Sequence, residues 1–358
     1  MAMTKVRVGL VGSGEVAQVI HLPILQTLSD RFELAAICDI SQELLAAMGA
    51  RYNIPPECRY TDYQDLAAQK DLDAVLVVNS DEYHTDSALA AIQHGKHVLI
   101  EKPMCLTRQD AEKIIKARDE AGVKVMVGYM RRFAPAFLEA VEQVRTLEKI
   151  NYVRVRDIIG QNSQFINQSS VVLRPKDIPE EAIQDRIERA DQMVKAAIGD
   201  VPTNLMRAYR MLGGLSSHDL SAMRELLGMP ERVIAARQHS RFLTVLFEYD
   251  GFTATYEVGV DHNCRFDAHI TVYGDTKEIR VQYDTPYIRH LPTQLFINET
   301  RGDSFEQRVI RPTFIDPYTL ELQHFHEVIT GNAQPKTTPE DFLQDLDLFA
   351  MIIRALRT

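Results

Sequence analysis

Short apolar runs alternate with amphipathic segments over the first 130 residues of the chain. The apolar runs predict strands at 5–11, 33–39, 73–79, 96–100 and 123–127. Between them, apolar residues recur at helical spacing and predict helices at 15–28, 42–52, 85–94 and 108–121. Repeated strand–helix–strand units of this length predict a parallel, doubly wound sheet.

The pattern changes after about residue 132. A helix is expected at 133–147, a strand at 152–159 and a polar helix at 180–197. Residues 232–283 then read as strands in series, with hairpin turns at Asp250-Gly251 and Gly274-Asp275. Two amphipathic helices, 318–330 and 339–357, close the chain. This half is therefore expected to be an α+β domain with a large, mostly antiparallel sheet.

Composition narrows the class of protein. The chain has 358 residues, a formal charge of −10 and no tryptophan. An acidic chain without a basic tract argues against nucleic acid and anionic membrane as partners. The segment 1–14 carries no apolar leader, and the four cysteines are far apart, so we expect reduced thiols, a cytoplasmic location and no metal site.

A glycine-rich turn follows the first strand and opens the first helix. Residues 12–17 read G-S-G-E-V-A, and the next strand ends at Asp39. In this context Gly12 permits the tight turn, Gly14 permits close approach of a pyrophosphate, and Asp39 suits a ribose diol. Ile40 and Ser41 supply no cation for a 2′-phosphate, which favours NAD over NADP. A purely structural turn, or another nucleotide, is the alternative.

The turn sets the expected domains. Residues 1–131 are predicted to form a dinucleotide-binding Rossmann domain. Residues 132–358 are predicted to bind substrate and to form the oligomer, with helix 339–357 able to pack back on the first domain.

The tripeptide Glu101-Lys102-Pro103 follows a predicted parallel strand at the sheet edge where such folds bind ligands. A partly desolvated lysine beside an oxidised nicotinamide has its pKa pushed down and can relay a substrate hydroxyl proton. By itself the tripeptide could equally be an exposed turn.

Taken together, these segments resemble the Gfo/Idh/MocA oxidoreductases. The resemblance rests on the glycine turn with Asp39 and on three further segments: V-V-N-S-D-E-Y-H (77–84), G-K-H-V-L-I-E-K-P (95–103) and V-G-Y-M-R-R-F-A-P-A-F (127–137). It implies a dehydrogenase or reductase that moves a hydride between NAD(P) and a secondary alcohol or ketone of a sugar, polyol or glycoside. It also implies homodimers or homotetramers, because the open face of the second sheet, if apolar, would need covering.

The resemblance implies roles for individual residues. Lys102 and His218 would share the proton transfer. The cofactor would be held by Gly12, Ser13, Gly14, Glu15, Val16, Asp39, Asn79, Ser80, His84, Glu101, Lys102 and Arg131. The substrate would contact Lys102, Met130, Arg131, Phe165, His218, Asp219 and Tyr287. A solvated surface pair is the alternative for Arg131 and Arg132, and an N-terminal helix position the alternative for His218.

The sequence departs from the family pattern at two places. The family motif D-x-G-x-H matches at His218, but Gly214 stands at the aspartate position and Ser221 at a later one. Asp219 is a candidate helper. The stretch 162–212 is longer than the family needs and could be a lid, an oligomer contact or a solvated helix. Two other functions stay open: a self-recycling, glycoside-modifying enzyme with tightly bound NAD, and a non-catalytic NAD-binding regulator.

Overall fold

The computed structural model describes residues 5–357, so the ends of the two expected domains at residues 1–4 and 358 lie outside the described residues. The chain forms two compact units. The first comprises 1–128, 170–201 and 321–343, and the second comprises 129–169, 202–320 and 344–358, as far as these ranges are described. Both units are discontinuous, because segments of the second half of the sequence belong to the first unit.

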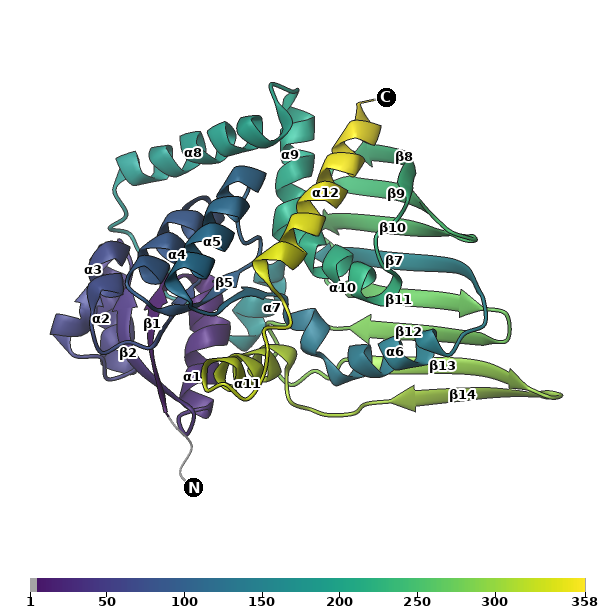
Figure 1. Cartoon of the computed structure of the whole chain (residues 1–358), viewed down its shortest axis with the longest axis horizontal. Helices are drawn as coiled ribbons and strands as arrows, with labels where there is room; N and C mark the ends of the chain where they lie inside the picture. Colours follow the sequence, from purple (N-terminus) through teal and green to yellow (C-terminus); the bar gives the residue numbers. More distant parts are fainter. Residues whose placement is uncertain (1–4, 358) are drawn as a thin grey trace. The chain divides into compact units, whose positions relative to one another are not determined.

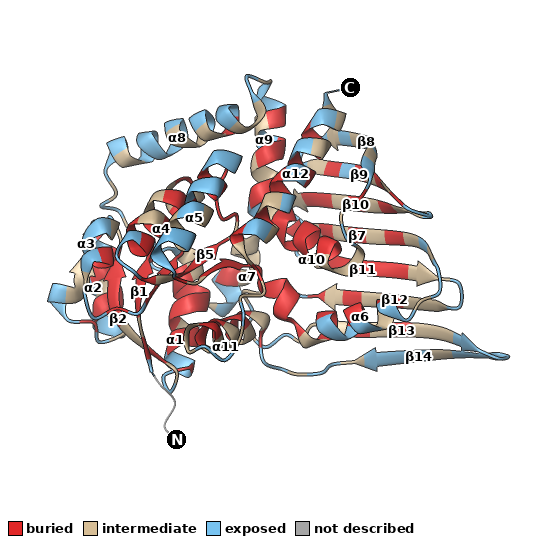
Figure 2. Cartoon of the chain, viewed as in Figure 1, coloured by how far each residue is buried: buried red, intermediate tan, exposed pale blue. Residues whose placement is uncertain are grey.

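A parallel sheet forms the centre of the first unit. Its described strands are β1 (Val6–Val11), β2 (Phe32–Cys38), β3 (Arg59–Tyr60), β4 (Ala74–Val77), β5 (His97–Glu101) and β6 (Val125–Gly128), in the order β3-β2-β1-β4-β5-β6. The order reverses between β1 and β4, the switch point at which open sheets of this kind bind ligands. All residues of β4 and β6 are buried, as expected for strands covered on both faces. In β1 all residues except Arg7 are buried, and most of this strand is red in Figure 2.

Helices connect these strands (Figure 1). A π-helical turn (Ala17–His21) leads into α1 (Leu22–Thr27), so the predicted single helix 15–28 is divided. The other helices of this half are α2 (Gln42–Arg51), α3 (Tyr63–Ala68), α4 (His84–Gln93) and α5 (Arg108–Ala121). Ser41 caps α2 by accepting from the N–H of Leu44, and Thr107 caps α5 in the same manner. From the second half come α8 (Glu180–Ile198) and most of α11 (Pro317–Ile329).

The second unit is built on a large sheet in the order β14-β13-β12-β11-β7-β10-β9-β8. Its strands are β7 (Ile150–Gly160), β8 (Arg232–His239), β9 (Phe242–Tyr249), β10 (Phe252–Asp261), β11 (Phe266–Gly274), β12 (Lys277–Tyr283), β13 (Gln294–Arg301) and β14 (Ser304–Ile310). Among the paired strands of this sheet, β7 and β10 run parallel and the other pairs are antiparallel. The predicted fold class is therefore confirmed, including both hairpin turns.

Helices cover one face of this sheet. The helix α6 (Pro135–Arg145) packs against β12 and β13, and α10 (Ser217–Leu227) packs against β7. The unit also contains α7 (Asn162–Ser169), α9 (Thr203–Met211) and most of α12 (Pro339–Leu356). Buried and half-buried residues alternate along β7, with Val153 and Val155 buried on the helix side.

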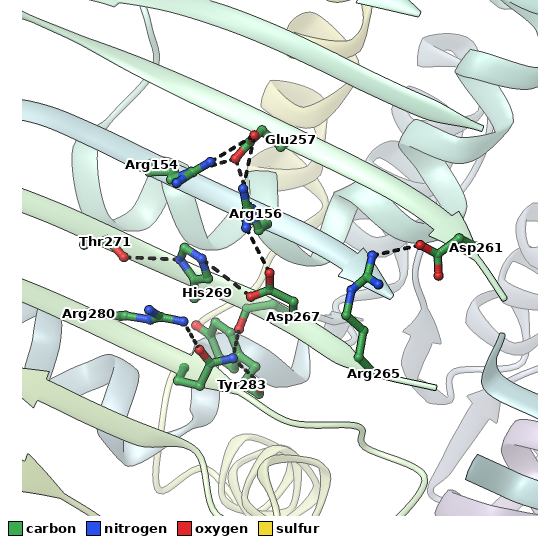
Figure 3. Close-up of polar contacts among 12 residues, drawn as sticks. Arg154, Arg156, Glu257, Asp261, Arg265, Asp267, His269, Thr271, Arg280 and Tyr283 are labelled. Carbon is green, nitrogen blue, oxygen red and sulfur yellow. Dashed lines mark hydrogen bonds and ion pairs between the residues drawn. The ribbon is translucent and has the colours of Figure 1, made fainter. Parts of the chain in front are cut away.

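The opposite face of the sheet carries charges. Arg154 and Arg156 of β7 both bind Glu257 of β10, at 2.7 and 3.1 Å from Nε to Oε2, and Arg156 reaches Asp267 of β11 at 3.0 Å (Figure 3). These three central strands therefore present charged side chains on the open face, and a need to cover an apolar surface does not arise there. Within the described residues, no helix is both long and apolar enough to span a membrane.

Candidate active site

The glycine turn begins directly after β1. Gly12 has a φ of +97°, and a Cβ atom there would lie 2.5 Å from the backbone nitrogen of Asn79, so a side chain has no room. A Cβ atom at Gly14 would meet nothing within 4 Å. The turn therefore packs tightly against the end of β4 at its first glycine and leaves open space at its second.

Asp39 binds the turn through its carboxylate. Its Oδ2 accepts from the N–H of Ser13 at 2.7 Å, and its Oδ1 accepts from the N–H of Ser41 at 3.0 Å. Burial raises the pKa of Asp39 above its ordinary value, although both backbone hydrogen bonds act in the opposite direction. The sequence brings Asp39 to the turn because β1 and β2 are adjacent parallel strands that end at the same edge.

Two buried polar atoms at this edge have no protein partner. Within the described residues, Ser13 Oγ and Asn79 Oδ1 are both inaccessible and without a hydrogen bond. Buried polar atoms normally find a partner, so such atoms beside an open glycine fit a bound polar ligand. The donors of the turn, the start of the following helix and the acceptor at Asp39 together fit a nicotinamide dinucleotide.

The segment Glu101-Lys102-Pro103 is held from two sides. Glu101, at the end of β5, lies with Oε1 2.9 Å from Nε2 of His21, and its Oε2 accepts from the N–H of Lys102 at 3.1 Å. Burial acts to raise the pKa of Glu101, but the hydrogen bond from His21 and the charges of His21 and Lys102 outweigh it and lower the pKa. Glu101 is thus an ionised carboxylate beneath Lys102.

His84, the first residue of α4, supports the same segment. Its Nδ1 lies 2.8 Å from the carbonyl oxygen of Pro103, and its Nε2 lies 3.0 Å from the carbonyl oxygen of Asn79. The Lys102–Pro103 bond is cis. His84 therefore links the ends of β4 and β5. Of the predicted cofactor-side residues, the structure brings together Ser13, Asp39, Asn79, His84, Glu101 and Lys102 in the first unit.

Arg131 belongs to the second unit and is buried in an ionic cluster. Its guanidinium binds Asp219 on α10 and lies 3.2 Å from Oδ2 of Asp157 on β7. The guanidinium also lies over the ring of Tyr283, 5.0 Å from its centroid. The alternative of a solvated arginine is therefore wrong for Arg131, and it is also wrong for Arg132, whose Nε binds Glu225 at 2.5 Å and which is buried as well.

Burial strongly affects the ionisation of Asp219. It raises the pKa of Asp219 well above its ordinary value; Asp157 raises it further, and Arg131 opposes the shift. The sequence did not indicate Asp157, which sits among Val153, Val155 and Ile159 on the helix side of β7; an acid in an otherwise apolar strand face was the available signal.

His218 lies in the first turn of α10 and is almost buried. At Gly214, where the family aspartate would stand, a Cβ atom would meet nothing within 4 Å. That position is therefore open. Asp219 directs its carboxylate to Arg131, and His218 and Lys102 belong to different units.

The remaining substrate candidates lie around a loop of the second unit. Met130 lines a pocket with Tyr283, Asp284, Arg289 and Asp316. Phe165 on α7 meets the edge of Phe266, with ring centroids 6.3 Å apart. The carbonyl oxygen of Tyr287 accepts from Ser169 Oγ at 3.3 Å, which ties the end of α7 to the loop. Within the described residues, no group of three or more His, Cys, Asp or Glu side chains could hold a metal ion.

Comparison with known proteins supplies independent information. The family model described as "Oxidoreductase family, NAD-binding Rossmann fold" matches residues 6–129. The chain is 31% identical over 344 residues to an inositol 2-dehydrogenase/D-chiro-inositol 3-dehydrogenase of Halalkalibacterium halodurans, covering 92% of this chain and 84% of the relative.

Solved structures share the fold. The WlbA dehydrogenase of Bordetella pertussis, in complex with NADH and UDP-GlcNAcA, has a TM-score of 0.71 and 22% identity, with 99% of this chain and 97% of that chain covered. A 3-ketoreductase of Actinomadura kijaniata, in complex with NADP and TDP-benzene, has a TM-score of 0.72 and 20% identity, with the same coverage of 99% and 97%. At these identities the likeness shows the fold alone.

Proposed function

Because the chain belongs to the Gfo/Idh/MocA family of oxidoreductases, we propose that it moves a hydride between NAD(H) and a secondary alcohol or ketone of a sugar, polyol or glycoside. It is a dehydrogenase or reductase that acts on CH–OH groups. The inositol dehydrogenase relative supports a cyclic polyol or sugar as the class of substrate. When bound, the nicotinamide supplies the hydride acceptor or donor.

We propose that the first unit holds the dinucleotide. Residues 12–16 would line the pyrophosphate at the start of the first helix, and Asp39 would accept from the adenosine ribose. Asn79, Ser80, His84 and Glu101 would border the path toward the nicotinamide. The observation that supports this best is the open glycine beside two unpartnered buried polar atoms, Ser13 Oγ and Asn79 Oδ1.

Lys102 would hold and move the hydroxyl proton of the substrate. A lysine in its neutral amine form can accept that proton as the hydride leaves, and in its ammonium form it can return the proton in the reverse reaction. The Glu101 carboxylate and the His84 bridge support the backbone on either side of it. His218 would share the proton transfer. Met130, Phe165 and Tyr287 would line the substrate site. The buried Arg131–Asp219 pair would position the substrate in that site.

Single-turnover and binding measurements test this function. Lys102→Ala is expected to retain NAD binding and to lose hydride transfer by about 10²- to 10⁴-fold. A panel of polyols and sugars is followed through the absorbance band of reduced nicotinamide. Lys116→Ala is the matched control, because this lysine is largely exposed on α5. Near-normal turnover by Lys102→Ala on a good substrate would refute the assignment.

We also propose that the chain forms a homo-oligomer. The family resemblance supports a homodimer or homotetramer, and light scattering is expected to give two or four times the mass of the chain. A monomer at micromolar concentration would contradict it.

A further inference from the structure

Residues 170–177, which we call the strap, lie against the nucleotide end of the first unit. Leu173 exchanges two hydrogen bonds with Gln18: its N–H donates to Oε1 at 2.8 Å, and its carbonyl oxygen accepts from Nε2 at 3.0 Å. Gln18 is buried and also donates to the carbonyl oxygen of Ser13 at 2.9 Å. Arg174 adds an ion pair with Glu15 at 3.0 Å. The strap is therefore bound to the helix that begins at the glycine turn.

The strap ends at the start of α2, where Asp177 takes two donors. Its Oδ1 accepts from Ser41 Oγ at 2.5 Å, and its Oδ2 accepts from the N–H of Glu43 at 3.0 Å. The N–H of Ser41 meanwhile donates to Asp39 at 3.0 Å. A continuous set of hydrogen bonds thus runs from the glycine turn through Asp39 and Ser41 to Asp177.

We infer that Asp177 is a specificity-determining residue that excludes a 2′-phosphate from the adenosine end of the dinucleotide site, and so favours NAD over NADP. The inference rests on the proposed function. It concerns a residue 138 positions beyond Asp39, in the stretch whose role the sequence leaves open.

The donors that Asp177 occupies are those that an anion would use. Free N–H groups at a helix start, together with a capping hydroxyl, form a common phosphate site. Here the hydroxyl of Ser41 and the N–H of Glu43 already bind a carboxylate of the chain itself. A 2′-phosphate would have to displace Asp177, whereas an unmodified ribose diol can donate to the acids already present.

The negative charge around the start of α2 also disfavours a 2′-phosphate. Asp39, Glu43 and Asp177 surround the start of α2, and the carboxylate of Glu43 accepts from the N–H of Lys176 at 3.0 Å. The hydrogen bonds from Ser41 and Glu43 lower the pKa of Asp177, so it is charged at neutral pH. Asp177 in turn contributes to the raised pKa of Asp39, which is due first to burial. A phosphate dianion would meet these charges at short range.

Two cations of the strap are the rival explanation. Arg174 pairs with Glu15, and Lys176 directly precedes Asp177. If the Lys176 ammonium served a 2′-phosphate, the strap would favour NADP instead. The experiment therefore includes Lys176.

Adenosine 2′,5′-bisphosphate and AMP are suitable probes, because they differ only in the 2′-phosphate and need no hydride transfer. Calorimetry with the full chain measures the dissociation constants of both probes. The dissociation constants of NAD and NADP are measured next. The wild type is expected to prefer AMP. In Asp177→Asn the ratio of the AMP affinity to the bisphosphate affinity should fall by about five- to tenfold, because the bisphosphate binds more tightly. The AMP affinity itself should change by no more than about twofold. Asp177→Arg should lower the ratio further.

Asp185→Asn is the matched control, because Asp185 lies on α8 and bonds the hydroxyl of Tyr83 instead. This variant should leave the ratio of AMP affinity to bisphosphate affinity unchanged. An unchanged ratio in both Asp177 variants, or weaker bisphosphate binding in Lys176→Ala with a wild type that prefers the bisphosphate, would overturn the inference. If neither NAD nor NADP binds the wild type, the proposed function itself fails. If NAD binds and the ratio ignores Asp177, only the present inference fails.

Discussion

His21 and Glu101 form a buried pair directly before Lys102, with 2.9 Å between Nε2 and Oε1. His21 lies in the π-helical turn after the glycines, and Glu101 ends β5, so the pair joins two segments 80 residues apart. The pair links the element that begins the nucleotide site to the residue proposed to move the proton.

Glu101→Gln tests the contribution of this pair to stability. Because the pKa of Glu101 in the folded protein lies below its ordinary value of 4.5, the carboxylate stabilises the fold above that pH and loses this effect as the pH falls through the folded pKa. The variant is expected to lower the free energy of unfolding by about 2–4 kcal/mol at pH 7. The difference should shrink below about pH 4.5.

Urea unfolding at pH 7 and pH 4 measures the difference. Glu120→Gln is the control, since Glu120 is largely exposed and pairs only at 3.8 Å with Lys116 in the neighbouring turn. If Glu101→Gln and the wild type lost stability in parallel on acidification, the ionised carboxylate would not be the stabilising species.

Arg131→Leu tests the ionic cluster of the second unit. The substitution leaves Asp157 and Asp219 buried without their cation, so unfolding should become easier by about 3–5 kcal/mol. The surface control Arg145→Leu should change stability by no more than about 0.5 kcal/mol. A loss of turnover at unchanged stability would instead indicate a direct contact with cofactor or substrate.

Asp219→Asn separates the two acids of that cluster. The pKa of Asp219 is raised by burial and by Asp157, so the wild type loses stability as the pH rises through that raised pKa. Asparagine keeps an acceptor for Arg131 and removes the like charge. The free energy of unfolding should therefore fall much less in this variant than in Arg131→Leu, and it should change less as the pH rises above 3.8, the ordinary pKa of the carboxyl. An equal cost for the two variants would contradict this account.

Much of this architecture follows from local pattern. The parallel strands are short apolar runs, and α5 spans the predicted residues 108–121, between Thr107 at its N-cap and Gly122 at its C-cap. The strands β13 and β14 were not predicted from the sequence. Most residues of β14 are exposed and its alternation is weak, whereas β13 does alternate over its first half. The sequence also does not reveal the π-helical turn Ala17–His21 within the predicted helix 15–28, because a π-helical turn and an α-helix share nearly the same apolar spacing.

The candidate site was predictable from the sequence only where a motif specifies backbone geometry. The turn 12–14, Asp39 and the segment 101–103 lie at strand ends whose order a parallel sheet imposes. His21, Asp157 and Asp177 could not be found in this way. Each acts through a partner at least 26 positions distant, and none belongs to a motif of its own.

The two glycines of the turn should respond differently to alanine. At Gly12 the φ of +97° and the 2.5 Å approach to Asn79 make a Cβ atom incompatible with the fold, so Gly12→Ala should destabilise the protein by about 1–3 kcal/mol. At Gly14 a Cβ atom meets nothing within 4 Å, so Gly14→Ala should keep its melting temperature and weaken NAD binding by about tenfold or more. Thermal unfolding and calorimetry separate the effects. Full NAD affinity in Gly14→Ala would place the pyrophosphate elsewhere.

His84 provides the last prediction, because it contacts the backbone of Pro103, directly after the proposed proton-relay residue Lys102, and the backbone of Asn79 after β4. Both of its contacts are carbonyl oxygens, at 3.0 and 2.8 Å, so it acts on the backbone beside Lys102 and serves as a positioning residue. His84→Leu removes both contacts and should lower kcat by about tenfold or more, with the Kd for NAD within about threefold. His84→Asn retains a donor and should recover part of that loss. Equal kcat values in the two variants, or a loss confined to NAD affinity, would show that His84 serves the cofactor and not the geometry of Lys102.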